Sequence, residues 1–312
     1  MDLRDAVFNV VFEIISKDKN TIVLTDDMGA LVLDKIRADF PAQAVNTGIS
    51  EQNLVSVAGG LALSGKKVFA YGIASHITRR CYEQIALDIC SMNLPVVILA
   101  VGSGLSYGWD GLTHHSNYDI AYMRALPGIA IYNPSDPISA GCAVRQAYKS
   151  AGPAYIRLDR DQSEPIYDAT KDFGKGMASI TGGKDVTLVA TGVMVHRALD
   201  VSKVLKSKGI RARVVDLYRI KPLNERALAA VLRGSKLVVT LEDHSSIGGI
   251  GDIAANVIAD NQLKVTLRRF SLGDRFFLGS ANREWVHEKE GLTSESVANS
   301  LIRIVRGKAK KR

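Results

Sequence analysis

Short apolar runs alternate with segments of helical periodicity along the first half of the chain. Five of these runs are apolar on both faces, which is typical of buried strands, and the segments between them have apolar or small residues at helical spacing. The expected strands are 21–25, 67–71, 95–101, 129–132 and 154–158, and the expected helices are 54–63, 79–92 and 137–149. This alternation predicts a parallel sheet that is covered by helices on both sides.

The alternation stops after residue 159 and resumes after residue 184. The stretch between them is polar and rich in glycine, as in Gly182-Gly-Lys-Asp, so we expect a linker between two domains. The second half has expected strands at 186–190, 212–217, 236–241 and 264–270, and expected helices at 195–207, 224–232, 250–260 and 294–305. The sequence therefore predicts two α/β domains with parallel or mixed sheets, at 1–165 and 185–312, joined by a linker at 166–184.

The composition is that of a globular protein, with 46% hydrophobic and 23% charged residues. The longest apolar run, 94–101, is too short to cross a bilayer, and the N-terminus has the spacing of an amphipathic helix rather than a signal peptide. The three cysteines are Cys81, Cys90 and Cys142. Their spacing fits neither a disulfide framework nor a metal site, so we expect a cytoplasmic protein with reduced thiols and no membrane association.

The formal net charge of +8 does not by itself indicate a nucleic-acid partner. Part of the excess lies in a short basic tail, which is usually a solvated chain end. The tail consists of Arg306, Lys308, Lys310, Lys311 and Arg312. No aromatic-basic RNA motif or zinc-finger spacing accompanies this charge, so we expect no nucleic-acid binding.

Two segments carry candidate chemistry, and ligands bind parallel α/β sheets at the carboxyl ends of strands. Glu51 stands where a helix is expected to begin, although a Ser50-Glu51 pair is also an ordinary helix cap. The loop Gly108-Trp-Asp-Gly-Leu-Thr-His-His follows the strand that ends at Val101 and contains two adjacent histidines. Imidazole suits proton transfer near neutral pH.

Several sequence blocks together, in this order, resemble the transketolase and deoxyxylulose-phosphate-synthase family. The blocks are Gly48-Ile-Ser-Glu-Gln-Asn, Ala58-Gly-Gly-Leu-Ala, Tyr82-Glu-Gln, Asp110-Gly-Leu-Thr-His, Asn133-Pro-Ser-Asp, Ile156-Arg-Leu-Asp-Arg, Asp185-Val-Thr-Leu-Val-Ala-Thr-Gly, Val214-Val-Asp-Leu-Tyr-Arg-Ile-Lys-Pro-Leu, and Glu242-Asp-His followed by Gly248-Gly-Ile-Gly. The resemblance covers essentially the whole chain. It implies that the first domain is a pyrimidine-binding domain and the second is the family's C-terminal domain.

The resemblance implies that Glu51 hydrogen-bonds the aminopyrimidine ring of thiamine diphosphate and helps the cofactor lose its thiazolium proton. Gln52 and Tyr82 belong to the same cofactor-binding blocks. The family often has an aromatic residue that stacks on this ring, and the aligned residue here is Ile77, beside His76. Either an aliphatic face replaces the ring, or the register differs by one residue.

The resemblance also assigns substrate contacts. His114 matches the family histidine that handles sugar hydroxyl protons, Asp110 matches an aspartate that contacts the donor sugar, and His115 replaces a glutamine. Arg160 matches an arginine that holds the substrate phosphate, with Arg157 as the nearby alternative.

Donor phosphate recognition departs from the family pattern in two places. A second family histidine falls at Gly102, and residues 28–31 hold no serine or arginine that could assist phosphate binding. The substrate is therefore left open between a phosphorylated and an unphosphorylated sugar.

The chain has no Gly-Asp-Gly motif, which in this family binds the diphosphate through Mg²⁺. We therefore expect a partner subunit with the diphosphate-binding domain and the metal, in an α2β2 assembly with the active site at the interface. A glycine-rich turn after Glu242 could cradle a phosphate or serve only for tight packing and dimer contact.

The leading functional hypothesis is one subunit of a split transketolase, which transfers a two-carbon ketol unit from a ketose to an aldose. The alternatives are a subunit similar to deoxyxylulose-phosphate synthase or to the β chain of a 2-oxo-acid dehydrogenase. A non-catalytic scaffold subunit is the alternative from another class.

Overall fold

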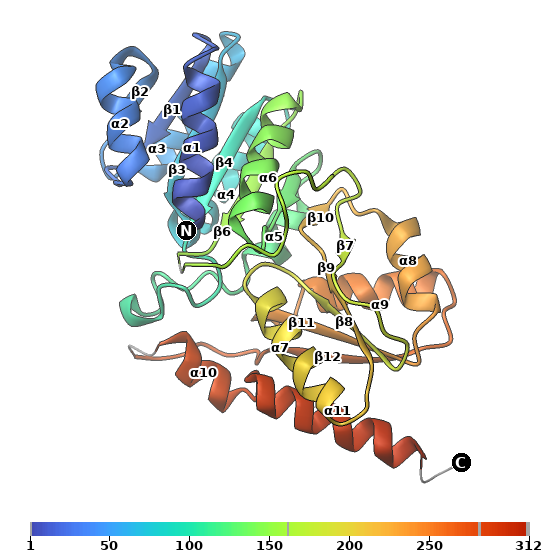
Figure 1. The fold of residues 1–312 in the computed structure, drawn as a ribbon. Coiled ribbons are helices and arrows are strands. Elements are labelled where there is room, and N and C mark those ends of the chain that lie inside the picture. The colour runs from blue at the N-terminus through green and yellow to red at the C-terminus, as the bar shows by residue number, and fades with distance from the viewer. Residues whose placement is uncertain (1, 161, 280–281, 310–312) are drawn as a thin grey trace.

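The computed structural model describes residues 2–160, 162–279 and 282–309. The side chain of Lys308, and residues Lys310, Lys311 and Arg312 of the basic tail, lie outside the described part. Within it, no helix has the length and apolar character needed to cross a membrane. The chain forms two lobes, one above the other in Figure 1, and each is built on one sheet.

The first lobe holds a seven-stranded sheet in the order β10-β5-β6-β4-β3-β1-β2. All neighbouring pairs are parallel except β10 with β5. The strands are β1 (Thr21–Thr25), β2 (Ala44–Asn46), β3 (Lys67–Ile73), β4 (Val96–Val101), β5 (Ala130–Tyr132), β6 (Ala154–Leu158) and β10 (Arg219–Lys221). The strands β1, β4 and β6 are buried at every residue, as their apolar composition predicts.

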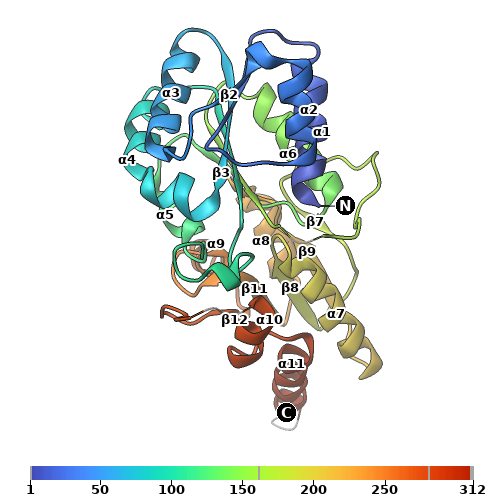
Figure 2. The ribbon, with the colours of Figure 1, turned by 90° about the vertical axis from the view of Figure 1, so that its left-hand side faces the viewer.

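Helices cover both faces of this sheet (Figure 2). The first face carries α1 (Leu3–Ile15), α2 (Leu31–Asp39) and α6 (Pro137–Lys149), with a 3₁₀ turn at Pro41–Gln43. The second face carries α3 (Glu51–Leu63), a π-helix (Ser75–Arg80), α4 (Tyr82–Gln84), a second π-helix (Ile85–Cys90) and α5 (Asp119–Ala125). The start of α6 is set by its sequence, because Asp136 accepts a hydrogen bond from the Ser139 amide at 2.8 Å and proline follows at the first helical position.

The second lobe holds a five-stranded sheet in the order β12-β11-β8-β9-β7, in which only β7 is antiparallel. The strands are β7 (Ala178–Ser179), β8 (Val186–Ala190), β9 (Ala212–Asp216), β11 (Leu237–Ser245) and β12 (Thr266–Leu272). One face packs on α7 (Met194–Ser207), α10 (Arg283–Lys289) and α11 (Ser294–Ala309), and the other on α8 (Glu225–Arg233) and α9 (Ile250–Asp260).

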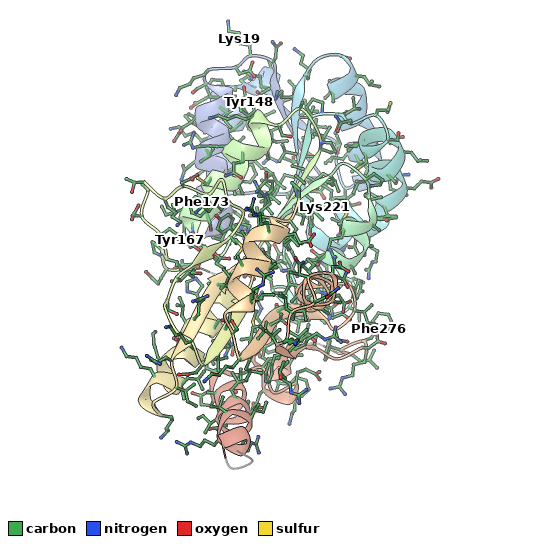
Figure 3. The ribbon with its side chains drawn as sticks, turned by 90° about the vertical axis from the view of Figure 1, so that its right-hand side faces the viewer. Lys19, Tyr148, Tyr167, Phe173, Lys221 and Phe276 are labelled. Atoms are coloured by element: carbon green, nitrogen blue, oxygen red, sulfur yellow. The ribbon has the colours of Figure 1, made fainter. Side chains whose placement is uncertain are left out.

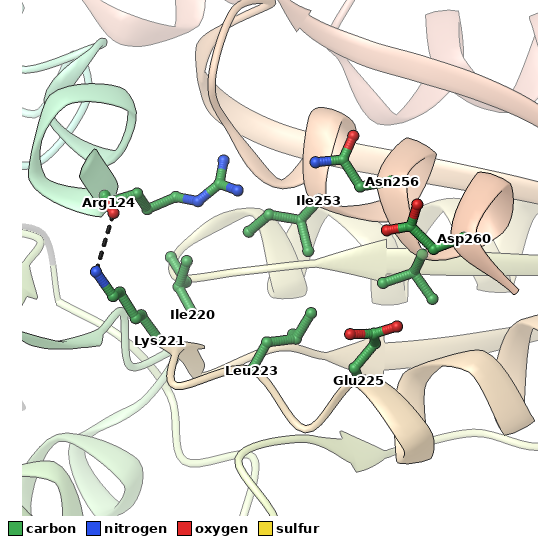
Figure 4. Close-up of a pocket in the computed structure, with 9 residues that line it drawn as sticks. Arg124, Ile220, Lys221, Leu223, Glu225, Ile253, Asn256 and Asp260 are labelled. Carbon is green, nitrogen blue, oxygen red and sulfur yellow. Dashed lines mark hydrogen bonds between the residues drawn. The ribbon is translucent and has the colours of Figure 1, made fainter. Parts of the chain in front are cut away.

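The two lobes share structure at their junction. The strand β10 follows β9 in the chain but completes the edge of the first sheet, and Lys221 in it lies where the lobes meet (Figure 3). One hydrophobic core runs from α3 and α5 of the first lobe to α8 and α9 of the second. A cavity of about 310 Å³ opens there, with Arg124 and Lys221 at one end and Glu225 and Asp260 at the other (Figure 4).

The segment that leads from the first lobe to the second is packed onto both. The Tyr167 hydroxyl donates to the buried Asp216 carboxylate at 2.8 Å, and the Ser135 hydroxyl donates to the same oxygen at 2.5 Å. The Phe173 ring lies 5.0 Å from the Tyr218 ring, and Figure 3 shows Tyr167 and Phe173 together on this segment. Although it is polar and glycine-rich, this part of the chain is ordered by side-chain contacts.

Most expected elements are present, and the fold class is confirmed as two α/β units with mixed sheets. The structure differs from the expectation in its short elements: β2, β7, β10, α2, α5 and α10 were not predicted. The expected helix at 79–92 is instead the two π-helices with α4 between them. Of these, β2, β7 and β10 have only two or three residues, too few for a hydrophobic period, so their neighbours decide their conformation.

Candidate active site

Glu51 is the first residue of α3 and is only 3% exposed. Its Oε2 accepts a hydrogen bond from Arg80 Nη1 at 2.7 Å, and its Oε1 lies 3.4 Å from His76 Nδ1. Ser50 does not cap the helix with its side chain, because its hydroxyl donates to the Thr47 carbonyl instead. The carboxylate therefore contacts two basic side chains from the π-helix that follows β3 in the chain.

The surroundings keep Glu51 ionised. Burial on its own would raise the pKa of Glu51, but its own backbone amide, the hydrogen bond and charge of Arg80, and the nearby His76 together lower that pKa below its usual value. Oε1 lies 3.4 Å from His76 Nδ1, which is beyond the usual length of a good hydrogen bond. This oxygen can therefore accept a hydrogen bond from a ligand.

A second buried acid, Asp26, lies beside Glu51 and was missed in the sequence analysis. It directly follows β1, and burial raises its pKa to about 7, with a further increase from the charge of Glu51. Its Oδ1 is buried and has no hydrogen-bond partner among the described residues. Its place at the carboxyl end of a buried parallel strand was the signal that could have identified it.

The expectation that Ile77 contacts the cofactor does not fit the structure. Ile77 has no exposed surface and belongs to the hydrophobic core, so a ligand cannot reach it. His76, one residue earlier, faces the carboxylate of Glu51, which is the alternative register. Of the other two expected cofactor contacts, Gln52 is exposed, and Tyr82 is half-buried with its hydroxyl donating to the Tyr122 carbonyl at 3.1 Å.

His114 lies in the loop that follows β4. Its ring centroid is 4.9 Å from that of His76 and 5.9 Å from that of Tyr107. Its Nδ1 is 2.9 Å from the Thr113 hydroxyl, so Nε2 is the ring nitrogen that remains for a ligand. Asp110 in the same loop is exposed to solvent.

His115 does not lie at the surface with its neighbour. It is 2% exposed, its Nε2 is 3.3 Å from the Gly108 carbonyl, and burial lowers its pKa. The expected substrate contact by His115 therefore does not fit its position, and the ring instead supports the loop from inside.

Arg160 is exposed, with its guanidinium 5.1 Å from the centre of the Tyr107 ring. The alternative Arg157 is buried and ion-paired with Asp119 at 2.7 Å, so it is not available to a substrate phosphate. Tyr107 also explains Gly102, whose backbone has a φ of +95°. A side chain there would place its Cβ 2.1 Å from the Tyr107 ring, so the tyrosine occupies the space that a histidine would need.

These contacts link five side chains of the first lobe into a row, in the sense that each contacts the next. The row runs from Glu51 through His76, His114 and Tyr107 to Arg160. It places a buried carboxylate at one end, an imidazole in the middle and a guanidinium at the other end. Such a row can hold a ligand that has a hydrogen-bond donor, hydroxyl groups and an anionic end in that order.

The glycine-rich turn after β11 is not a free phosphate cradle. The Glu242 carboxylate accepts hydrogen bonds from the Ile250 amide at 2.7 Å and the Gly251 amide at 2.9 Å. These are the amides at the start of α9 that a phosphate would need, so the turn serves packing. No group of three potential metal-ligating side chains occurs among residues 2–160, 162–279 and 282–309.

Family models match both halves of the chain. The model of the transketolase pyrimidine-binding domain matches residues 1–165, and that of the transketolase C-terminal domain matches residues 175–297. The linker expected at 166–184 thus overlaps the start of the second match.

Curated relatives and a solved structure are similar over nearly the whole chain. A protein described as a putative transketolase C-terminal section from Methanocaldococcus jannaschii is 35% identical, over 96% of this chain and 95% of its own length. One of the subunits of an apulose-4-phosphate transketolase from Actinobacillus succinogenes is 33% identical, over 97% of this chain and 99% of its own length. The structure of a split-gene transketolase, described as an inactive beta4 tetramer, aligns with a TM-score of 0.89 at 32% identity and covers 98% and 99% of the two chains.

Proposed function

The chain belongs to the transketolase family, and from this premise we propose that it supplies the Glu51 half of an active site that moves a two-carbon ketol unit from a ketose to an aldose. It is a subunit of a thiamine-diphosphate-dependent transferase that acts as a hetero-oligomer. The row from Glu51 to Arg160 carries this proposal, because its chemistry follows the order of cofactor ring, sugar hydroxyls and substrate anion.

Glu51 fits the ring end of thiamine diphosphate. The cofactor, when bound, supplies the carbanion chemistry, and the protein supplies orientation and proton handling. Oε1 of Glu51 would share a proton with a ring nitrogen of the bound cofactor, and Arg80 keeps the other oxygen in place. A carboxylate suits this task because it can share a proton with a ring nitrogen across one short hydrogen bond.

The remaining residues of the row act on the substrate. His114 accepts and returns the proton of a sugar hydroxyl at Nε2, because Thr113 occupies its Nδ1. Asp110 lies four residues earlier in the same loop and accepts a hydrogen bond from another hydroxyl of the donor sugar. Arg160 binds the anionic end of the sugar, which a planar guanidinium can do with two parallel hydrogen bonds.

A partner chain completes the site. It carries the diphosphate-binding domain and the Mg²⁺ that holds the diphosphate, and the two chains form an α2β2 assembly. The absence of a Gly-Asp-Gly motif from this sequence supports the proposal, as does similarity to one subunit of another transketolase and to a split-gene enzyme.

Calorimetry and a ketol-transfer assay test the proposed function. We expect the chain alone to bind thiamine diphosphate and Mg²⁺ weakly, and the complex with its partner to bind them tightly and to transfer a ketol unit. Glu51→Gln should lower kcat by roughly 10²- to 10⁴-fold, the usual contribution of a proton-transferring side chain.

Glu83→Gln, a change in an acid of α4 outside the row, is the matched control and should be active. Unchanged activity of Glu51→Gln would favour a scaffold subunit. Tight cofactor binding by the chain alone would exclude the split site.

A further inference from the structure

The loop that carries Asp110 and His114 is closed at its base. Gly104 and Ser116 exchange two backbone hydrogen bonds, at 3.0 and 2.9 Å, and so tie the two ends of the 104–116 loop together. Arg157 also donates to the Ser116 carbonyl at 3.1 Å. The position of the whole loop therefore depends on what holds this base.

The side chain of Leu105 anchors the base of the 104–116 loop in the second lobe. This residue is 1% exposed and belongs to the hydrophobic core that includes residues of α7, α10 and α11. A residue of the first lobe is thus part of the core of the second lobe, three positions before the turn that contains Asp110.

The second lobe also holds the loop backbone, through Asp243 of β11. Asp243 Oδ2 accepts a hydrogen bond from the Leu105 amide at 3.0 Å. The approach is so close that a Cβ at position 104 would lie 2.2 Å from this oxygen, and Gly104 has a φ of +58°. The sequence therefore has a glycine where the loop meets the aspartate.

Asp243 is itself fixed from α10. Its Oδ1 lies 3.1 Å from His287 Nε2, and its Oδ2 lies 3.1 Å from Arg283 Nε. Burial would raise the pKa of Asp243, but His287 and Arg283 hold it well below its usual value. The carboxylate is therefore charged and has partners on the side away from the loop.

The same arginine reaches the segment of Arg160. Arg283 Nη2 contacts the Asp159 carboxylate at 2.5 Å and the Ser103 carbonyl at 3.3 Å. The Arg160 amide in turn donates to the Ser106 hydroxyl at 3.0 Å. The 104–116 loop and the segment that contains Arg160 are thus both tied to α10 of the second lobe.

We propose that the second lobe sets the position of the catalytic loop, with Asp243 as the positioning residue that holds the loop base at Leu105. The expected effect on catalysis rests on the proposed function, whereas the expected effect on the mobility of the loop does not. Asp243 contacts the Leu105 amide, Arg283 and His287, and we assign its effect to the loop backbone.

Trp109 reports on the loop directly, because it is 66% exposed within it and the chain has only one other tryptophan, Trp285. In a Trp285→Phe background, acrylamide quenching and anisotropy decay of Trp109 measure loop mobility in the full chain without any assay of activity. We expect Asp243→Asn to increase both the quenching constant and the amplitude of fast depolarisation. Leu105→Ala is the second variant, for the case in which Asp243→Asn does not fold, and should have the same effect.

Glu242→Gln is the matched control. It changes the neighbouring buried carboxyl of the same strand, which contacts α9 and not the loop. Increased Trp109 mobility in the two loop variants but not in the control supports the proposal. Unchanged mobility in both loop variants, or an equal increase in Glu242→Gln, overturns it.

The reconstituted complex gives a second readout. Asp243→Asn should lower kcat by roughly 10²-fold, the cost of a displacement of about 1 Å, with unchanged affinity for thiamine diphosphate because Glu51 lies on another element. An equal loss of cofactor affinity would contradict a specific effect on the loop. If the wild-type complex transfers no ketol unit, the proposed function fails, and Trp109 mobility still decides the structural proposal.

Discussion

Glu51 is paired with Arg80 at 2.7 Å and not with the adjacent Arg79. Arg79 points to Tyr118, where its guanidinium lies 5.7 Å from the ring and donates to the hydroxyl. Two neighbouring arginines therefore have separate environments, so each serves as a control for the other.

Arg80→Gln should destabilise the chain at pH 7 by roughly 1–2 kcal/mol, the contribution of a charged hydrogen bond, reduced because Arg80 is half exposed. The pKa of Glu51 is lowered in the folded state, so its ionisation stabilises the fold above the unfolded pKa, and this contribution is lost as the pH falls through the folded pKa. The difference in the free energy of unfolding between Arg80→Gln and wild type should therefore shrink toward low pH, below the folded pKa of Glu51. Urea unfolding at neutral and acidic pH measures it, with Arg79→Gln as the control. A pH-independent difference would contradict the role of Glu51.

Arg160→Gln should raise KM for a phosphorylated sugar by about 10- to 100-fold and leave kcat nearly unchanged, because a charge-assisted hydrogen bond to the distant anion is lost in ground state and transition state alike. Steady-state kinetics of the complex measure both constants. Arg211→Gln, an exposed arginine of the second lobe, is the control. An equal KM of the wild type for sugars with and without the phosphate would assign Arg160 another role.

Asp216→Asn should stabilise the chain at pH 8 and have little effect at pH 4. Burial raises the pKa of Asp216 to about 7, so the folded state binds a proton that the unfolded state loses. Stability from this group is present below the unfolded pKa and is lost as the pH rises through about 7. Each unit of pKa difference corresponds to about 1.4 kcal/mol, so the gain at pH 8 is on the order of a few kcal/mol. Thermal melts at both pH values test this.

Asp200→Asn is the control for that experiment, because Asp200 is exposed on α7. It should melt like the wild type at both pH values. If Asp216→Asn instead destabilises the chain at pH 8, the hydrogen bonds that the Asp216 carboxylate accepts from Ser135 and Tyr167 stabilise its charged form by more than burial destabilises that form.

Gly249→Ala should destabilise the second lobe by roughly 3 kcal/mol, because overpacking a closed site is costly. The new Cβ would lie 1.9 Å from Glu242 Oε2, and Glu242 cannot retreat without breaking its bonds to α9. Gly60→Ala is the opposite case, since Gly60 is exposed in α3 with open space around it, and should stabilise by about 1 kcal/mol. Chemical unfolding of both variants provides the comparison. Equal effects would contradict the packing described for Glu242.

Strong periodicity accounts for the part of the fold that the sequence predicted. The strands β1, β6 and β8 and the helices α6 and α9 have the bounds expected from their apolar runs and helical spacing. The strands β7 and β10 were missed because pairing with distant segments, rather than their own composition, makes them strands.

The candidate site likewise combines residues whose place the sequence predicted with residues whose place it did not. His114 and Arg160 follow buried strands in the sequence, so their approximate place was predictable. Glu51 follows the short, largely exposed strand β2, and was identified from its place at a helix start and from the family resemblance. His76 entered the prediction only as the one-residue alternative to Ile77, and in the structure the π-helix Ser75–Arg80 brings His76 to the Glu51 carboxylate. Tyr107 joins the row through its packing against Gly102, which depends on a backbone turn that no side-chain pattern encodes.

The strand β10 has a consequence for how this polypeptide can be divided. It comes from beyond the linker yet closes the border of the first sheet beside β5. A fragment that ended before the linker would leave β5 with unpaired amides and carbonyls, and would lack the α8 and α9 residues that fill the shared core. Neither half is thus a self-sufficient module, and we expect two fragments cut at the linker to fold only when they are present together.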